Sequence, residues 1–276
     1  MKNLFGINNE GNNFNKFIVR SASTTSNEKM DELANKGTMI QKKEAGPGWL
    51  NLLATMCLGL GLLFIVGILG AKDGFKEALK TRGYLFYIGI VMFVFGLAYT
   101  IFAKIKSKKG KNSETVKNFV NEQETLKKEI LNELRIPENS TTIDILFTRV
   151  KENKEGKEVT KSMGLFTHLN SEVYLFIEND KVYFADCGAV IEISVDSFKS
   201  IDKINKTIII PKWNKEVPFN NEKYKEYKVK QNGYGMFYVK PYYSIKLLID
   251  NEDYEILIPN YDLKEFLKVV PLNVNE

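Results

Sequence analysis

Two apolar stretches decide the fold: WLNLLATMCLGLGLLFIVGILGA, from Trp49 to Ala71, and GYLFYIGIVMFVFGLAYTIFA, from Gly83 to Ala103. Neither stretch contains a charged residue. A helix of this length reaches about 32 to 35 Å, which matches the roughly 30 Å hydrocarbon core of a bilayer. Trp49 and Tyr84 lie near the ends, where aromatic rings favour the interface. We therefore predict a transmembrane helical hairpin over residues 48–103, surrounded by lipid.

The connection between the two spans, Lys72 to Arg82, is short enough to force the helices to run antiparallel. This connection carries four basic residues, whereas the outer flanks of the two spans carry eight. These eight are Lys36, Lys42, Lys43, Lys104, Lys106, Lys108, Lys109 and Lys111. Cytoplasmic flanks carry the excess of Lys and Arg in membrane proteins. The flanks therefore predict a multi-pass protein of the cell membrane with both termini in the cytoplasm.

Small residues form a stripe on each predicted span. Ala54 and Gly61 are seven residues apart, as are Gly89 and Gly96, so each pair lies on one helix face where helices can approach closely. The stripes serve either packing within the hairpin or assembly of a homo-oligomer. We favour packing within the hairpin, because the short connection already makes these two helices neighbours.

The composition excludes several classes of protein. The chain has 276 residues, of which 44% are apolar and 26% charged, so it is neither collagenous nor wholly disordered, and two cysteines exclude a disulfide-dense scaffold. The 35 lysines, four arginines and 26 asparagines are typical of an AT-rich genome, and we take the source as bacterial. The net charge of +5 lies beside the spans, whereas residues 112–276 carry a net charge of −4. This placement argues against a nucleic-acid-binding protein.

Outside the hairpin, the pattern predicts three further segments. Residues 1–47 are rich in Asn, Ser and Lys, and we expect a polar, largely flexible tail with one short helix that starts near Thr25 and ends near Gly37. Residues 104–136 form a basic juxtamembrane segment and an amphipathic helix that ends before Pro137. This helix either continues the second span or packs on the soluble domain that follows it.

Residues 137–276 change to the two-residue period of β-strands. The expected strands lie around Ile143–Phe147 and over Val173–Ile177, Lys181–Phe184, Val190–Ser194, Thr207–Ile210, Tyr227–Lys230, Met236–Val239, Ile245–Ile249 and Tyr254–Ile258. Turns are expected at Asn179-Asp180, at Asn232-Gly233 and at Asp250 to Asp253. A last amphipathic helix, capped by Asn260, carries its apolar stripe to Val270 and ends at Pro271. This order predicts a mainly β, α+β domain, built as an antiparallel barrel or sandwich with a C-terminal helix.

Strands followed by one terminal helix resemble the pleckstrin-homology (PH-like) superfold, and VIEISVDSFKSI, Val190 to Ile201, resembles bacterial PH-like domains. Some bacterial membrane proteins place such a domain after a transmembrane hairpin. Phosphoinositide-binding members of the superfold gather basic residues around the first hairpin turn. We take Glu178 to Lys181 as the corresponding turn, and its net acidic charge means that the resemblance does not extend to this ligand.

The sequence offers little catalytic chemistry. The single histidine, His168, has no second histidine or suitable cysteine to complete a zinc set, and a dyad with Cys187 lacks a supporting motif. No phosphate-binding loop follows a strand. We therefore expect no enzymatic activity, no catalytic or metal-binding residues and no cofactor.

Two groups of residues are candidates for contacts. The first group determines the membrane topology and also attracts anionic lipid. It consists of Lys104, Lys106, Lys108, Lys109 and Lys111. Trp213, flanked by Lys212 and Lys215, either contacts a partner from a loop or lies in the core. The segment Glu222 to Lys246 interleaves Lys with Tyr; we interpret it as strand alternation and not as a single-strand nucleic-acid surface.

The sequence thus predicts a membrane-anchored, non-enzymatic binding or scaffolding protein. Its cytoplasmic PH-like domain would face an unidentified protein partner or the inner leaflet. The alternative is an accessory subunit of a larger membrane complex, in which the hairpin and the domain both pack on other subunits.

Overall fold

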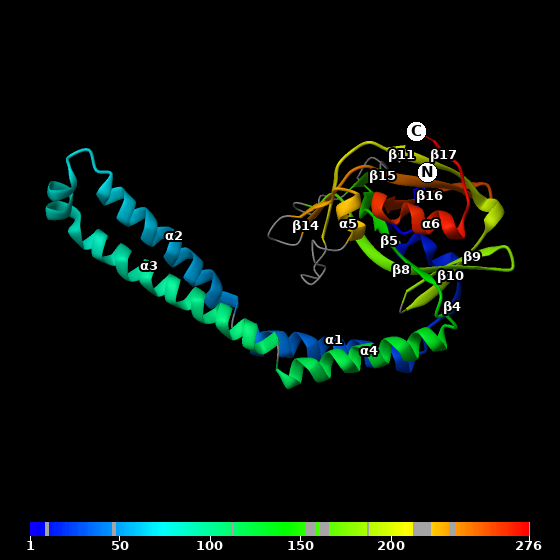
Figure 1. Ribbon diagram of the computed structural model, residues 1–276, viewed down its shortest axis with the longest axis horizontal. Helices are drawn as coiled ribbons and strands as arrows, with labels where there is room; N and C mark the ends of the chain where they lie inside the picture. Colours follow the sequence, from blue (N-terminus) through cyan, green and yellow to red (C-terminus); the bar gives the residue numbers. More distant parts are fainter. Residues whose placement is uncertain are drawn as a thin grey trace. The chain divides into compact units, whose positions relative to one another are not determined.

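A computed structural model divides the chain into two compact units (Figure 1). The β unit combines Met1–Ser23 with Glu129–Glu276, and the helical unit is Thr24–Lys128. The structure describes residues 1–8, 11–45, 48–111, 113–152, 158–160, 166–186, 188–211, 222–231 and 236–275. The helical unit is therefore inserted into the sequence of the β unit, after the first 23 residues.

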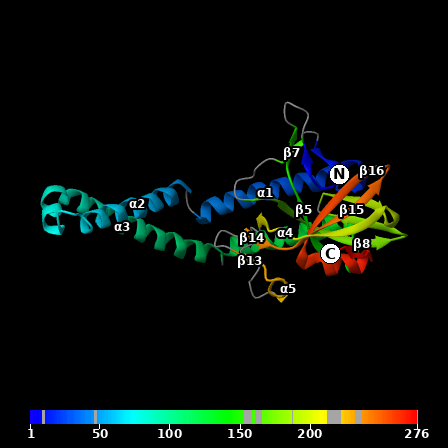
Figure 2. The same ribbon diagram turned by 90° about the horizontal axis from the view of Figure 1, so that it is seen from above.

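The helical unit contains the two predicted spans, which lie side by side (Figure 2). Its helices are α1 (Thr24–Ala45), α2 (Gly48–Leu69), α3 (Phe75–Lys111) and most of α4 (Glu114–Glu133). The apolar parts of α2 and α3 have mean hydropathies of 2.6 and 2.2, and no more than 17% of their most apolar windows is buried. A core helix of a soluble protein is mostly buried, so these exposed apolar helices favour a bilayer as their surroundings.

Glycines bring α2 and α3 into close contact. A Cβ atom on Gly61 would lie 2.7 Å from the carbonyl oxygen of Gly89, and one on Gly96 would lie 2.7 Å from that of Ala54. Ala54 itself is almost fully buried. The small-residue stripes thus serve packing within the hairpin, which is the interpretation that we favour from the sequence.

The connection between the spans is shorter than the expected Lys72 to Arg82. Helix α3 begins at Phe75, after a turn at Gly74 with a φ of +84°, and the helical backbone is interrupted at Arg82 (φ −131°). A left-handed turn of this kind favours glycine. One turn or more of helix therefore precedes the second apolar stretch, in a segment that we expected to be a loop.

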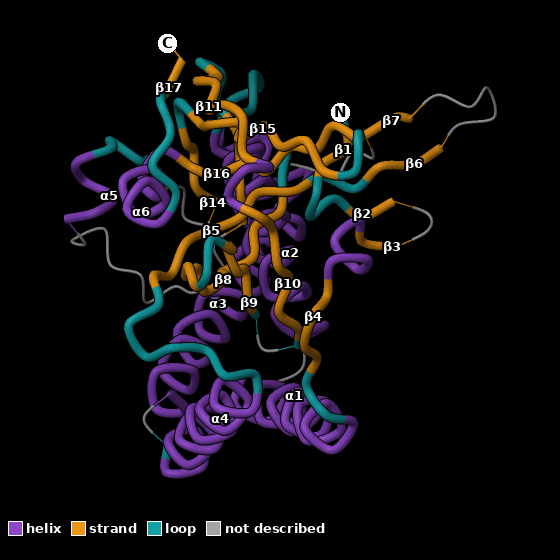
Figure 3. Tube along the Cα trace, turned by 90° about the vertical axis from the view of Figure 1, so that its right-hand side faces the viewer, coloured by secondary structure: helices purple, strands orange, loops and turns teal. Residues whose placement is uncertain are grey.

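Helices α1 and α4 lie side by side (Figure 3) and differ from the expectation in two respects. Helix α1 has 22 residues and continues past Gly37, where a helix stop was expected. Gly37 instead allows the close approach of the Phe119 ring of α4, because a Cβ at this position would lie 2.7 Å from that ring. Helix α4 begins after Ser113, whose hydroxyl accepts a hydrogen bond from the Val116 amide at 3.3 Å. Up to Lys128, α4 therefore packs on a partner helix that the sequence pattern did not suggest.

Helix α4 ends as predicted, just before Pro137. Arg135 adopts a left-handed conformation (φ 54°), and the Ile136 amide donates to the Leu131 carbonyl at 2.9 Å. This bond is the signature of a Schellman termination. The remaining residues of α4 belong to the β unit, in which Ile130 and Leu134 are buried.

The β unit is built on a ten-stranded sheet with the order β17-β11-β15-β16-β5-β8-β9-β10-β4, and β1 pairs with β16. The strands are β1 (Lys2–Asn3), β4 (Ile18–Ser21), β5 (Thr141–Phe147), β8 (Leu169–Glu178), β9 (Lys181–Ala185), β10 (Ala189–Ser194), β11 (Phe198–Ile204), β15 (Tyr242–Ile249), β16 (Glu252–Pro259) and β17 (Val274–Asn275). Pairing is antiparallel except at β1 and β17. Smaller sheets are formed by β2 (Ile7–Asn8) with β3 (Gly11–Asn12), by β6 (Val150–Glu152) with β7 (Glu158–Thr160), and by β12 (Ile208–Pro211), β14 (Met236–Val239) and β13 (Lys230–Gln231).

One hydrophobic core joins strands from all along this sheet. Ile191 of β10 and Ile201 of β11, which lie near opposite ends of the strand order, belong to the same buried cluster as Ile145 of β5. The sheet must therefore curve around a single core. Helix α6 (Leu263–Val269) closes part of it with Phe266, which is fully buried.

The centre of the sheet is covered on both faces. Along β5, Ile143 and Ile145 enter the main core, whereas Leu146 joins a second cluster with β12, β14 and the short helix α5 (Glu222–Glu226). Strand side chains alternate between faces, so a strand buried on both sides has four consecutive buried residues, as β5 does. This second layer explains why the Thr207–Ile210 and Met236–Val239 segments are strands although they lie outside the main sheet.

The predicted turns and strands are largely confirmed where the structure describes them. Asn179-Asp180 and Asp250-Asn251 both adopt positive φ angles, as two-residue turns of antiparallel hairpins require. The expected strand Tyr227–Lys230 is wrong, because helix α5 and a turn precede the short β13. Asn260 does not cap α6; it opens a 3-10 turn (Asn260–Asp262), and its side-chain amide donates to the Lys240 carbonyl at 3.0 Å.

The expectation of a flexible N-terminal tail is corrected for residues 1–23. Leu4 and Phe5 are buried in the main core, and β4 pairs with β10 along the edge of the sheet. Residues 24–45 of the expected tail form α1. The β unit resumes at Glu129, not at the predicted boundary of 137.

The glycine contacts between α2 and α3 give a prediction with an internal control. Gly61→Ala forces a methyl group against the α3 backbone, and we expect a lower thermal unfolding midpoint for the full chain in detergent. Gly59→Ala and Gly67→Ala meet no atom within 4 Å, so these changes keep or raise the midpoint through better helix propensity. Equal effects at all three positions would contradict the packing.

Candidate functional site

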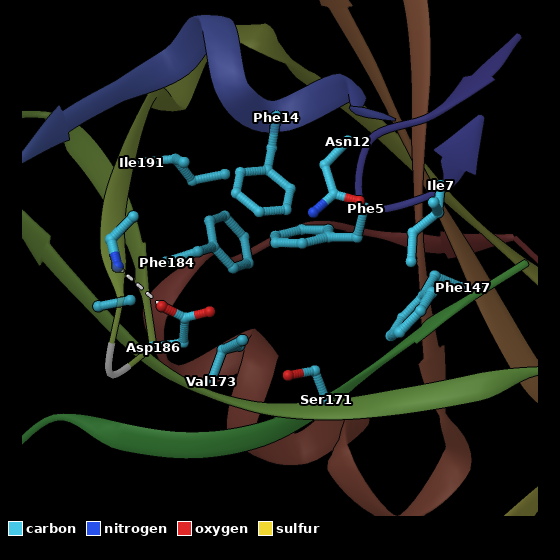
Figure 4. Close-up of a pocket in the computed structure, with 12 residues that line it drawn as sticks. Phe5, Ile7, Asn12, Phe14, Phe147, Ser171, Val173, Phe184, Asp186 and Ile191 are labelled. Atoms are coloured by element: carbon cyan, nitrogen blue, oxygen red, sulfur yellow. Dashed lines mark hydrogen bonds between the residues drawn. The ribbon is translucent and has the colours of Figure 1, made fainter. Parts of the chain in front are cut away.

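A cavity of about 110 Å³ lies inside the β unit, where the N-terminal segment covers strands β5, β8, β9 and β10 (Figure 4). Phe5 and Phe14 come from the N-terminal segment, and Phe147 and Phe184 come from the sheet. The Phe5 ring lies 5.4 Å from Phe14 and 5.7 Å from Phe184 between ring centroids. Most of the wall is therefore aromatic or aliphatic, which is typical of small-molecule sites.

Three polar side chains border this cavity: Asn12, Ser171 and Asp186. Asp186 follows β9, and its Oδ1 accepts the amides of Gly188 and Ala189 at 2.7 and 2.8 Å. These bonds fix the turn into β10 and hold the carboxylate in place. The cavity thus has an apolar interior and one fixed negative charge at its border.

Backbone hydrogen bonds hold the N-terminal segment over the sheet. The Leu4 amide donates to the Glu255 carbonyl at 2.8 Å, and the Ile7 amide donates to the Thr148 carbonyl at 3.1 Å. Asn13 Nδ2 donates to the Asn3 carbonyl at 2.7 Å, which closes the intervening loop. The position of Phe5 and Phe14 in the cavity wall depends on these contacts.

A charged cluster at Glu252 fastens the same segment from outside. Lys2 and Lys16 each place Nζ 2.9 Å from a carboxylate oxygen of Glu252, which also accepts a hydrogen bond from Tyr254. The hydrogen bonds from Tyr254, Lys16 and Lys2 hold the pKa of Glu252 down to about 2. The Lys16 ammonium also lies 4.9 Å from the centroid of the Tyr254 ring.

A buried polar network joins β5 to the 3-10 turn Asn260–Asp262, which precedes α6. The Tyr261 hydroxyl donates to Asp144 Oδ2 at 2.7 Å, and the Asp144 amide donates to Asp262 Oδ2 at 2.8 Å. Burial and the two nearby carboxylates raise the pKa of Tyr261 well above its usual value. Both carboxylates are at most 3% exposed, so the network stabilises the fold and offers no surface for a substrate.

The lysines predicted to contact lipid lie in the last turns of α3. Lys104 and Lys106 are exposed, whereas the side chains of Lys108, Lys109 and Lys111 are outside the described part of the structure. Trp213, Lys212 and Lys215 also lie outside the described residues. Both sets of contacts remain predictions.

The Tyr and Lys segment follows the strand interpretation only in part, because Met236–Val239 is strand β14 whereas Tyr224 and Lys225 lie in helix α5. Tyr224 and Phe237 point into the second hydrophobic cluster, and Lys225, Lys230 and Lys240 are exposed. These two rings are therefore part of the core, whereas Tyr227 is only partly buried and has the Lys264 ammonium 5.6 Å from its ring centroid.

His168 packs on the ring of Tyr242, with 5.7 Å between centroids, and burial lowers its pKa below the usual 6.5. Its Nδ1 lies 3.3 Å from the hydroxyl of Thr167. Cys187, the other member of the dyad considered from the sequence, is not among the described residues. In the described part of the chain, no three His, Cys, Asp or Glu side chains are grouped as a metal ion would require.

The sequence did not point to the cavity, because residues far apart in the chain form it. One signal was available: the apolar residues of the first 20 positions, which include Leu4, Phe5, Phe14 and Phe17, are more than a solvated tail needs. Comparisons with protein-family models, with curated proteins and with solved structures find no match to this chain. Its function has to be argued from its own residues.

The Glu252 cluster predicts how the N-terminal segment responds to pH. Because the pKa of Glu252 is lowered, its stabilisation is present above about pH 4.5 and is lost as the pH falls toward 2. We expect Glu252→Gln at neutral pH, and acid in the unmodified chain, to lower the hydrogen-exchange protection of the Leu4 amide. Glu265→Gln, which removes only an exposed pair with Lys268, should leave that protection unchanged. Equal losses in the two variants would refute this role.

Proposed function

We propose that this protein is a membrane-anchored, non-enzymatic binding protein whose β unit is a PH-like domain that engages a protein partner at the cytoplasmic face of the membrane. The observation that carries the proposal is the insertion of the helical unit into the β unit. Both ends of the apolar hairpin return to one folded unit, so a membrane that holds α2 and α3 also holds this unit at its surface. Confinement of this kind raises the effective concentration for a partner in the same membrane.

The strand order supports the PH-like part of the proposal. Strands β11, β15, β16, β5, β8, β9 and β10 are consecutive antiparallel neighbours, and helix α6 follows β16. This is the pattern of strands and one terminal helix that carries the resemblance. The turn Glu178 to Lys181 joins the second and third of these strands along the chain, whereas β5 and β8 are joined through residues 148–168. The acidity of that turn therefore gives no information about a phosphoinositide.

The distribution of basic residues supports the orientation. If α2 and α3 both cross the bilayer, the two parts of the β unit lie on the same side. The lysines from Lys104 to Lys111 flank that side, and the connection around Lys72 to Arg82 carries fewer basic residues. This asymmetry favours both termini in the cytoplasm.

Site-specific photo-crosslinking in the native host tests the proposal. A benzophenone side chain replaces Trp213, Leu248 of the β unit or Val91 of α3; Leu248 is 40% and Val91 68% exposed. We expect a discrete protein adduct from at least one of the two β-unit positions and none from Val91, which would face lipid.

Protein adducts at Val91 as well as at Trp213 or Leu248 would replace the proposal with the alternative of an accessory subunit, whose hairpin and domain both pack on other subunits. An absence of adducts at both β-unit positions would contradict the proposal. Adducts that form only with outer-surface proteins would reverse the orientation.

A further inference from the structure

The aromatic cavity of the β unit has features that partner binding does not explain. We propose that it binds a small organic cation: a molecule with one aromatic ring or a branched alkyl group and a protonated amine. This inference goes beyond the proposed function and does not depend on it, because it rests on the cavity alone.

The size and the wall of the cavity define the apolar part of the ligand. Its volume of about 110 Å³ is close to that of an engineered protein cavity, roughly 150 Å³, that takes up benzene. On one side the Phe5 ring is tilted against the ring of Phe14 and meets that of Phe184 edge to face. A single ring or a short branched chain fits this space and would bury most of its surface there.

The carboxylate of Asp186 defines the charge of the ligand. Its Oδ1 is held by two backbone amides, and in Figure 4 its other oxygen points toward the interior of the cavity. That oxygen, Oδ2, has no hydrogen-bond partner among the described residues. A fixed acceptor beside aromatic faces favours a cation, through an ion pair and cation–π attraction.

Two neutral groups complete the border. Figure 4 shows the carboxamide of Asn12 and the hydroxyl of Ser171 at the cavity, on either side of the aromatic rings. Few polar groups in an apolar pocket fix the orientation of a ligand. An anion would meet the charge of Asp186, and a purely apolar ligand would leave this carboxylate with a poorer environment than water provides. A small ammonium compound satisfies both parts of the site.

The test measures binding of 4-fluorobenzylammonium, 4-fluorobenzyl alcohol and 4-fluorobenzoate to the full chain in lipid nanodiscs, by fluorine NMR titration. We expect the ammonium compound to bind more tightly than the alcohol, and the benzoate not to bind. Asp186→Asn keeps an oxygen acceptor for the two turn amides but removes the charge. This variant should lower the affinity for the ammonium compound by about tenfold or more and leave the affinity for the alcohol unchanged.

Two further variants control for partitioning into lipid and for unfolding. Asp180→Asn changes a turn carboxylate of another hairpin, and its titration should match that of the unmodified chain. Ser171→Leu fills the cavity and should abolish binding of both the ammonium compound and the alcohol. If this variant is unfolded by circular dichroism, the comparison of Asp186→Asn with Asp180→Asn decides the question.

Three results would overturn the inference. Identical titrations of the unmodified chain and the Asp186→Asn variant with the ammonium compound would show that Asp186 does not bind the cation, and no binding to either protein would show that the cavity holds water only. Equal affinity for the ammonium compound and the alcohol would remove the role of the charge. None of these results affects the photo-crosslinking outcome, so the failure of this inference and the failure of the proposed function are distinguishable.

Discussion

The burial of Leu4 and Phe5 in the core of the β unit is the contact on which the other features depend. These side chains join strands that follow in the sequence only after residue 140, with a helical unit of more than 100 residues in between. Because both parts of the β unit are needed to enclose one core, folding brings the two ends of the helical unit together. The Ser23 amide donates to Glu133 Oε1 at 2.6 Å at this junction. A helical hairpin attached in this way has two connections to the β unit instead of one.

The same contact creates the cavity. The sheet supplies Phe147, Phe184 and the Asp186 turn, and the N-terminal segment that lies over them supplies Phe5 and Phe14. That segment is held by backbone bonds to β16 and by the Glu252 cluster. It continues through β4 directly into α1, the first helix of the helical unit. The wall of the cavity and the start of the helical unit are therefore parts of one continuous stretch of chain.

The sequence predicted those elements whose signal is local. An uncharged run of more than 20 residues, the Asn179-Asp180 turn and the apolar stripe ending at Val270 each depend on neighbouring residues, and each is found in the structure. The prediction of a strand at Tyr227–Lys230 is wrong because Tyr224 and Val229 are buried in a cluster around β12 and β14. This burial overrides the alternating sequence pattern on which the prediction was based.

The N-terminal segment and the cavity could not be predicted in this way. Lys2 of β1 lies opposite Tyr254 of β16, more than 250 residues away, in a parallel strand pair. No periodicity in residues 1–23 indicates such a contact. The polar composition of the segment resembles that of a flexible tail, and only the number of apolar residues argues otherwise. Asp186 likewise has the local signature of a turn residue, and its place at a cavity depends on Phe5 and Phe14 from the other end of the chain.

The most direct test of the account compares two soluble proteins by thermal unfolding. In the first, a short Gly/Ser linker replaces residues 24–128, so that Ser23 and Glu129 are joined; in the second, the chain starts at Glu129. The account predicts cooperative unfolding of the first protein and a much lower midpoint, or no folded state, for the second. Equal midpoints would show that the first 23 residues are dispensable and would contradict the account.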